Sequence, residues 1–234
     1  MSKILKRILI TGASGGIGRA VAEALASPET ELILHGRKKS VLDELAGKVK
    51  SRGGQCKIAM AEISTIDDIT SLIEQVGSGQ IDVVIHAAGV AFVDDIEKIK
   101  TEEWQKSIDI NITAPFLITQ RLLPQMREGG SIVFLLSVAA KTAFPSWGAY
   151  CTSKFALEGF SQVLREELRP RKIRVINIYP AATATEIWDS IPGDWSKENM
   201  LSPDKVADAI KYALAQEPST AVENISLGNI HGNQ

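Results

Sequence analysis

The segment ILITGASGGIGRA, residues 8–20, runs from an apolar stretch through a glycine-rich turn into a segment of helical period. Gly12, Gly16 and Gly18 lack side chains where a backbone must turn tightly and approach a pyrophosphate. Such a group would lie at the positive end of a helix that begins near Gly16. The spacing is G-x-x-x-G-x-G and differs from the more common G-x-G-x-x-G. After a first strand, this turn predicts a site for the phosphates of a dinucleotide.

Beyond this unit, short apolar runs rich in Ile and Val alternate with longer segments of helical period. The alternation predicts a doubly wound parallel sheet, whose strands are covered on both faces and need not alternate in polarity. We expect strands at Arg7–Ile10, Leu32–His35, Lys57–Ala61, Val83–His86, Ile132–Leu136, Val175–Ile178 and Val222–Ser226. We expect helices at Gly16–Leu25, Ser40–Lys50, Thr65–Val76, Thr101–Met126, Trp147–Leu168 and Pro203–Ala215. Pro115 and Pro124 should bend or end parts of the fourth helix.

The composition favours one α/β domain over residues 1–234, because 44% of the residues are hydrophobic and suffice for one large core. The formal net charge is −2 and the basic residues are scattered, so we expect no nucleic-acid partner and no membrane partner. Cys56 and Cys151 are too few for a disulfide framework and lack metal-ligand spacing, which favours a cytoplasmic protein without a metal site. The apolar run near the amino terminus is too short for a signal sequence or a membrane span.

The stretch from Pro180 to Leu201 is long for a loop inside a compact domain. It carries Trp188 and Trp195 among polar residues, which predicts a substrate lid at residues 186–201 with apolar anchors. The alternative is a packed surface loop whose tryptophans fill gaps.

The end of the second predicted strand bears on the choice of cofactor. An enzyme that uses NAD usually carries an acid about twenty residues after the glycine turn, against the ribose 2′-hydroxyl. This chain has Gly36 followed by Arg37 at that place. Arg37 is suited to charge-assisted bonds with a 2′-phosphate, with Ser14 as a second donor, so the pattern favours NADP(H) over NAD(H). The alternative is a solvated arginine beside Lys38 and Lys39.

The segment YCTSK, residues 150–154, places Tyr150 and Lys154 four positions apart in a predicted helix and therefore on one face of it. A tyrosine ionises near pH ~10, and an ammonium group beside it favours the phenolate. The pair is thus a candidate acid–base device. The alternative is a half-buried tyrosine that packs against the stem of a surface lysine.

Five features in this order, TGASGGIG, HAAG, DINITA, a serine after the fifth strand and YCTSK, resemble those of the short-chain dehydrogenases/reductases. The resemblance covers essentially the whole chain and is to the compact, single-domain type. It implies a three-layer, Rossmann-like sheet of about seven strands, a nicotinamide cofactor and a catalytic group of Asn, Ser, Tyr and Lys. By motif, these four are Asn111, Ser137, Tyr150 and Lys154.

The resemblance also suggests what each group does. Tyr150 would give a proton to the alkoxide that forms as NADPH delivers hydride to a carbonyl carbon. Lys154 would favour the phenolate that remains, and Ser137 would hydrogen-bond the substrate oxygen. Asn111 would disrupt its helix locally and hold a water that links Lys154 to solvent. No G-x-S-x-G elbow surrounds Ser137, which argues against a serine hydrolase.

The residues that we expect to contact the cofactor come from the glycine turn, the strand ends and the catalytic pair. They are Gly12, Ser14, Gly16, Ile17, Gly18, Arg37, Glu62, Ala88, Gly89, Tyr150, Lys154, Pro180 and Thr185. By the resemblance, Ala88 and Gly89 match the turn under the cofactor, and Thr185 matches a threonine that binds the carboxamide.

Three places depart from the family pattern. His86 and Ala87 stand where the family usually has two asparagines, and we expect His86 to donate to a backbone carbonyl rather than act in catalysis. Glu62 replaces an aspartate near the adenine, or is simply solvated. Ala181 replaces a glycine after the sixth strand, which restricts the backbone at the carboxamide contact.

Apolar side chains from several loops should converge above the nicotinamide and form a substrate pocket. These are Phe92, Val138, Phe144, Trp147, Ala182 and Trp188. None is a cationic clamp, so we expect hydride transfer between NADP(H) and a small, fairly apolar carbonyl compound or secondary alcohol. One alternative is that several of these side chains only support the loop. Another is a catalytically silent NADP(H)-binding regulatory or scaffold protein.

The two helices that carry the catalytic Asn and Tyr have apolar residues to spare. They include Phe116, Leu117, Leu123, Phe155 and Phe160. In look-alike family members the equivalent helices pack across a dimer face, so the resemblance predicts a homodimer or homotetramer.

Overall fold

Strand β1, Lys6–Thr11, pairs in parallel with β2 on one side and with β4 on the other, so the order of the strands reverses there. The computed structural model describes residues 5–217 and 219–230, and within them seven parallel strands form one sheet in the order β3-β2-β1-β4-β5-β6-β7. The remaining strands are β2 (Thr30–Gly36), β3 (Gln55–Met60), β4 (Ile81–His86), β5 (Met126–Leu135), β6 (Arg174–Pro180) and β7 (Asn224–Leu227).

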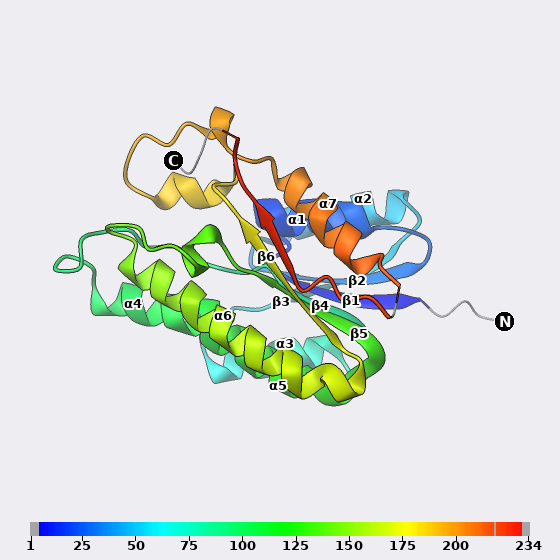
Figure 1. The fold of residues 1–234 in the computed structure, drawn as a ribbon. Coiled ribbons are helices and arrows are strands. Elements are labelled where there is room, and N and C mark those ends of the chain that lie inside the picture. The colour runs from blue at the N-terminus through cyan, green and yellow to red at the C-terminus, as the bar shows by residue number, and fades with distance from the viewer. Residues whose placement is uncertain (1–4, 218, 231–234) are drawn as a thin grey trace.

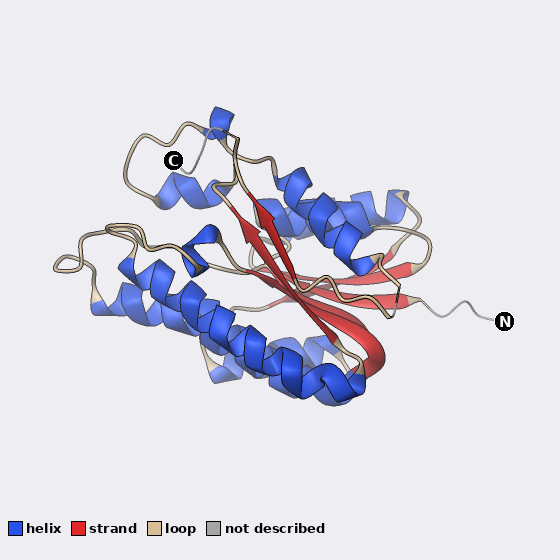
Figure 2. Ribbon diagram, viewed as in Figure 1, coloured by secondary structure: helices blue, strands red, loops and turns tan. Residues whose placement is uncertain are grey.

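Helices cover both faces of this sheet and complete a three-layer structure (Figures 1 and 2). They are α1 (Gly16–Leu25), α2 (Lys39–Ser51), α3 (Ile66–Val76), α4 (Thr101–Ile108), α5 (Ala114–Leu122), α6 (Gly148–Leu168) and α7 (Pro203–Leu214). Helices α1, α2 and α7 lie on one face, and α3 to α6 lie on the other. The doubly wound, Rossmann-like, single-domain fold expected from the sequence is confirmed.

The apolar strands supply both cores, because successive side chains of a strand point to opposite faces. Leu9 packs into the core beneath α3, α5 and α6, whereas Ile8 and Ile10 pack into the core beneath α1, α2 and α7. All six residues of β4 are buried. This two-sided burial explains why the strand sequences show continuous hydrophobicity rather than alternation.

The helix predicted at Thr101–Met126 is interrupted, as the two prolines indicated, and it ends before Met126, which begins β5. The chain forms α4, a π-helical turn at Asp109–Thr113, α5 and a short 3₁₀ turn at Leu123–Gln125. Pro115 lies at the beginning of α5, directly after the π-helical turn, and Pro124 lies in the 3₁₀ turn that ends the segment.

Strand β5 begins earlier than the predicted Ile132, because Met126 already pairs with Ile81. The register then shifts, so that Val83 pairs with Ser131. Gly129, with a φ of 77°, lies inside this irregular stretch. Strand β7 spans Asn224–Leu227 and begins two residues later than predicted. These shifts lie at strand starts, so they leave the carboxyl ends of the strands on one edge of the sheet.

Candidate active site

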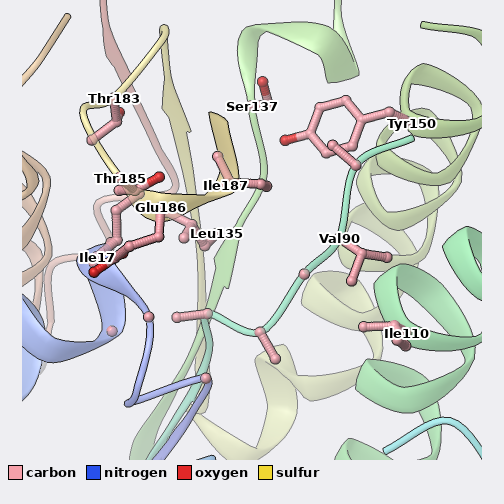
Figure 3. A pocket seen from close by; sticks show the side chains of 18 of the residues that line it. Ile17, Val90, Ile110, Leu135, Ser137, Tyr150, Thr183, Thr185, Glu186 and Ile187 are labelled. Atoms are coloured by element: carbon pink, nitrogen blue, oxygen red, sulfur yellow. The ribbon is translucent and has the colours of Figure 1, made fainter. Parts of the chain in front are cut away.

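A cavity of about 460 Å³ lies at the carboxyl edge of the sheet, above the point where the strand order reverses (Figure 3). The sequence-predicted residues that line it are Gly12, Ser14, Gly16, Ile17, Gly18, Arg37, Glu62, Ala88, Gly89, Phe92, Ser137, Val138, Phe144, Trp147, Tyr150, Lys154, Pro180, Ala182, Thr185 and Trp188. Asn111 does not line the cavity. The sheet therefore brings together candidates that are spread over more than half of the chain.

The glycine turn has close backbone contacts that leave no room for side chains. Gly12 has a φ of 69°, and a Cβ on it would lie 2.6 Å from the Cα of Ala88. A Cβ on Gly18 would overlap the carbonyl oxygen of Gly12. Helix α1 thus begins directly against the turn, and no side chain caps its first N–H groups. An uncapped helix start that borders the cavity fits the anionic diphosphate of a dinucleotide.

His35 was not singled out from the sequence, yet it supports the glycine turn from behind. Its Nδ1 accepts a hydrogen bond from the Gly12 N–H at 3.4 Å, and its Nε2 lies 3.1 Å from the carbonyl oxygen of Ala61. Burial lowers the pKa of His35 to about 4, so the ring is neutral at neutral pH and donates from Nε2. The available signal was a histidine at the end of an apolar strand, directly before Gly36.

Arg37 faces a carboxylate that the sequence did not place beside it. Its Nη1 lies 3.5 Å from Oε2 of Glu62, and the two side chains are 56% and 51% exposed. A Cβ on Gly36 would lie 2.6 Å from the hydroxyl of Ser14, so Ser14 closely borders the backbone before Arg37. An exposed ion pair of this kind is weak. Arg37 is therefore free to exchange Glu62 for another anion.

Tyr150 and Lys154 lie on the same face of α6. The Nζ of Lys154 is 5.6 Å from the centre of the Tyr150 ring and donates to the carbonyl oxygen of Leu135 at 2.8 Å. The phenol of Tyr150 extends toward Ser137, which follows β5 (Figure 3). A reacting carbonyl oxygen between Ser137 and Tyr150 would meet two hydroxyl donors.

Burial determines the protonation of this pair in the protein alone. It raises the pKa of Tyr150 to about 12, while the side chain of Ser137 opposes this shift. It lowers the pKa of Lys154 to about 8. The sequence predicted that Lys154 would favour the phenolate, but in the protein alone burial is the main influence on the pKa of Tyr150. At neutral pH the site holds a protonated phenol and an ammonium group.

Asn111 occupies the π-helical turn, so the local helix disruption expected at this residue is present. Its side chain binds the loop after β4 twice, accepting from the Val90 N–H at 2.9 Å and donating to the Val90 carbonyl oxygen at 2.8 Å. It also donates to the hydroxyl of Ser153 at 2.9 Å. A Cβ on Gly89 would lie 3.2 Å from Oδ1 of Asn111 and 3.8 Å from Nζ of Lys154, so glycine keeps the space between them open.

His86 differs from its predicted environment. Its Nε2 lies 2.9 Å from the hydroxyl of Thr119 instead of a backbone carbonyl, and its ring stacks on Phe134 with 5.0 Å between centres. Burial lowers the pKa of His86 to about 3, so the ring is neutral at neutral pH. Thr119 lies on α5 and is far from His86 in sequence, which is why the hydroxyl partner was not foreseen.

The alanine at position 181 causes no backbone strain. Among the described residues, only Ser146 and Lys172 combine a side chain with a positive φ. The N–H of Ala181 donates to the carbonyl oxygen of Leu227 at 2.8 Å, and the carbonyl oxygen of Ala181 accepts from the hydroxyl of Thr183 at 2.9 Å. The turn after β6 is thus closed without a glycine.

Three of the four tryptophans of the sequence meet beside the catalytic candidates. The ring of Trp147 contacts Tyr150 edge-on at 5.5 Å between centres and Trp188 at 5.8 Å, and Trp188 contacts Trp195 at 4.9 Å. The Nε1 of Trp188 donates to the carbonyl oxygen of Thr183 at 2.9 Å. Trp147 and Trp188 line the cavity, so its wall beside Tyr150 is aromatic.

The loop that carries two of these tryptophans contains 3₁₀ turns at Glu186–Ser190 and Lys197–Asn199. A bridge between Thr183 and Leu201 closes its base.

Within the described part of the chain, no cluster of His, Cys, Asp or Glu fits a metal ion, and no helix is long and apolar enough to cross a membrane.

Comparison with known proteins agrees with this geometry. The sequence profile described as short chain dehydrogenase matches residues 6–194. An uncharacterised oxidoreductase of Listeria monocytogenes is 30% identical, over 95% of this chain and 96% of the relative. The sepiapterin reductase of Chlorobaculum tepidum is also 30% identical, over 94% of each chain.

Two solved structures are similar over almost their whole length. An alcohol dehydrogenase of the archaeon Thermococcus sibiricus, complexed with 5-hydroxy-NADP, is 26% identical with a TM-score of 0.90, over 98% of this chain and 99% of the other. The angucycline C-6 ketoreductase LanV with bound NADP is 26% identical with a TM-score of 0.85, over 96% and 95% of the two chains.

Proposed function

This chain is an oxidoreductase of the short-chain dehydrogenase/reductase family, and we propose that it transfers a hydride between NADP(H) and a small, fairly apolar carbonyl compound or secondary alcohol. The observation that carries this proposal is the convergence of Ser137, Tyr150 and Lys154 on the cavity that also contains the glycine turn. The structures of similar proteins with bound NADP or a derivative of it support the choice of cofactor.

We assign the residues that hold the cofactor as follows. The glycine turn and the first N–H groups of α1 bind the diphosphate. Arg37, with Ser14, binds the 2′-phosphate and gives up Glu62 to do so. Pro180 and Thr185, which line the same cavity, bind the carboxamide end. The bound nicotinamide supplies or accepts the hydride.

The proton steps belong to the side chains of the protein. In the reductive direction, the phenol of Tyr150 donates its proton to the carbonyl oxygen of the substrate as negative charge develops there. The hydroxyl of Ser137 donates a hydrogen bond to the same oxygen and orients it. The ammonium of Lys154 stabilises the phenolate that Tyr150 becomes. Asn111 holds the loop beside Lys154, and a water in the space beside Gly89 would carry the replacement proton.

The substrate wall favours a neutral compound with an aromatic ring. Trp147 and Trp188, together with Phe144 and Phe92, line the cavity near Tyr150. Aromatic rings gain about 0.5–1.5 kcal/mol per edge-on or offset contact beyond the burial of their area. A planar aryl ketone should therefore bind this aromatic wall more tightly than a saturated ketone of equal size does. Residues 186–201, which contribute Trp188, are the lid of this pocket.

A homodimer or homotetramer is part of the proposal. Phe116 on α5 and Phe155 on α6 are 40% and 45% exposed, and these helices lie on the same outer face of the sheet (Figure 1). Large exposed apolar side chains on one face favour association with a second copy.

A carbonyl panel read by the loss of NADPH absorbance tests the function. It includes acetophenone and cyclohexyl methyl ketone, which share their carbon number and differ in the aromaticity of the ring. We expect NADPH oxidation that depends on the carbonyl compound, with a ratio of kcat/KM that favours acetophenone. Trp147→Leu should lower that ratio about 2- to 10-fold, since one aromatic contact is lost. Trp104→Leu is the matched control, because Trp104 lies on α4 and does not line the cavity.

Two results would count against the proposal. Tight NADPH binding without turnover of any carbonyl compound or alcohol would favour the catalytically silent, cofactor-binding alternative. An unchanged ratio in Trp147→Leu would remove the aromatic preference and leave the oxidoreductase assignment standing.

A further inference from the structure

The first residue of the lid places a carboxylate against the start of α1. Glu186 begins the 3₁₀ turn Glu186–Ser190, and its Oε1 lies 2.5 Å from Nη2 of Arg19. Its Oε2 is 3.2 Å from the position that a Cβ on Gly16 would take. Figure 3 shows Glu186 beside Ile17, in the first turn of α1. The carboxylate thus pairs with a cation of α1 and lies close to Gly16, at the uncapped start of that helix.

This location is the one that the diphosphate of the cofactor requires. The first N–H groups of a helix carry partial positive charge and attract a carboxylate for the same reason that they attract a phosphate. Gly16 and Glu186 both line the main cavity. An anion on this helix start and the carboxylate of Glu186 exclude each other, because two like charges would share one small region.

We propose that the carboxylate of Glu186 competes with the diphosphate of the cofactor for the space beside Gly16 at the start of α1, so that cofactor binding displaces the beginning of the lid. The inference rests on the proposed use of NADP(H). It makes Glu186 a determinant of cofactor affinity, with a carboxylate that must leave before the diphosphate enters.

A second cavity gives the displaced carboxylate a place to move. This cavity, of about 410 Å³, shares Gly16, Thr185 and Glu186 with the main cavity and is also lined by Arg19 and Lys197. The Arg19–Glu186 pair therefore forms part of the wall between the two. A small rotation of the Glu186 side chain away from Gly16 would keep it near cationic side chains.

The alternative is that Glu186 assists cofactor binding, and it predicts the opposite change in the Kd of NADPH. If Glu186 served only to orient Arg19 toward the diphosphate, its removal would weaken cofactor binding. The direct approach of Oε2 to the Gly16 position favours competition, because a purely orienting carboxylate would lie behind Arg19 and away from the helix start.

Titration of NADPH into the whole protein, read by the fluorescence of the cofactor, decides between these roles. Glu186→Gln should lower the Kd of NADPH about 3- to 10-fold, since one charge at a helix start and one exposed ion pair are involved. Asp189→Asn is the matched control, because Asp189 lies in the same turn but pairs with Lys197. Its Kd should stay within about twofold of the wild-type value.

Adenosine 2′-phosphate serves as a second probe, because it lacks the diphosphate. Glu186→Gln should change its Kd less than about twofold, since the gain is confined to the helix start.

An NADPH affinity of Glu186→Gln that equals the wild-type value, or is weaker, would overturn the inference and leave the proposed cofactor intact. Equal tightening for adenosine 2′-phosphate would also overturn it, since the effect would then be a general change of charge. Failure of both the wild type and Glu186→Gln to bind NADPH would overturn the proposed cofactor together with the inference.

Discussion

Lys154 and Tyr150 share one face of α6, and burial moves their pKa values in opposite directions, to about 8 and about 12. In the protein alone, Tyr150 therefore stays protonated and able to donate at neutral pH. Lys154 carries its charge only below about 8. His35 and His86, with pKa values of about 4 and about 3, stay neutral above pH 5 and add no ionisation there.

The rate of carbonyl reduction should accordingly fall as the pH rises through the pKa of Lys154, about 8. Above that pH the neutral amine no longer stabilises the phenolate that Tyr150 becomes. The measurement is kcat/KM against pH from 6 to 10, because this ratio reports the ionisations of the protein without its ligands. Lys154→Arg, whose charge persists above pH ~12, should lose this alkaline limb even if its rate is lower. A flat wild-type profile would contradict the role given to Lys154.

We propose that Arg37 decides the choice between NADPH and NADH. Hydrogen bonds to a charged group contribute ~1.5–3 kcal/mol each, so we expect NADPH to bind about 10- to 100-fold more tightly than NADH. Arg37→Gln should weaken NADPH far more than NADH, as measured by titration at low ionic strength. Lys39→Gln is the control, since Lys39 is exposed and pairs with Asp43. Equal wild-type affinities for the two cofactors would show the assignment to be wrong.

The π-helical turn between α4 and α5 connects α6, the helix that carries Tyr150, to the loop after β4. Asn111 satisfies both backbone groups of Val90 and contacts Ser153 on α6. Removing it leaves the partly buried N–H and carbonyl groups of Val90 without their side-chain partner, which costs about 1–3 kcal/mol per group. The turn thus has a structural role that is separate from any water held beside Lys154.

Asn111→Ala should lower the free energy of unfolding by about 2 kcal/mol or more and reduce turnover as well. Urea unfolding and kcat are the two measurements. Thr65→Ala offers a matched control, because it removes the capping box that Thr65 and Asp68 form at the start of α3, and neither residue lines the cavity. That change should cost about 1 kcal/mol of stability and leave kcat unchanged. Full stability in Asn111→Ala would show that the three hydrogen bonds contribute little.

Elements of strong periodicity could be predicted from the sequence, and those decided by distant contacts could not. The β1 turn and α1 follow from local glycine spacing. The early start of β5 depends on the pairing of Met126 with Ile81, which no local pattern encodes. In the same way, Glu62 meets Arg37 and His35 meets Gly12 only because β1, β2 and β3 end side by side. The sequence therefore predicted which residue types lie in the cavity better than it predicted their partners.

The whole molecule brings three distant parts of the chain to one cavity: the turn after β1, the start of α6 and the loop after β6 (Figure 1). The same sheet leaves α5 and α6 with exposed aromatic side chains on the outer face. The cavity and the proposed association surface thus share α6. Association would stabilise the helix that carries Tyr150.

Light scattering at micromolar concentration should give the mass of a dimer or tetramer. The Phe155→Asp variant should contain more monomer than the wild type does, because the substitution introduces a charge into the apolar contact. Tyr212→Ser is the control, since Tyr212 is 60% exposed but lies on α7, on the opposite face. A monomeric wild-type protein would contradict the proposed association.

We propose that Tyr150 supplies the proton while the rest of the cavity holds the cofactor. The most direct measurement compares wild type and Tyr150→Phe for both the Kd of NADPH and the rate of NADPH oxidation with a reducible ketone. Loss of one hydroxyl should leave the Kd within about threefold, since most cofactor contacts lie elsewhere, and should lower turnover by ~10²–10⁴. A Tyr150→Phe variant that binds NADPH normally and retains most of the wild-type rate would contradict the account.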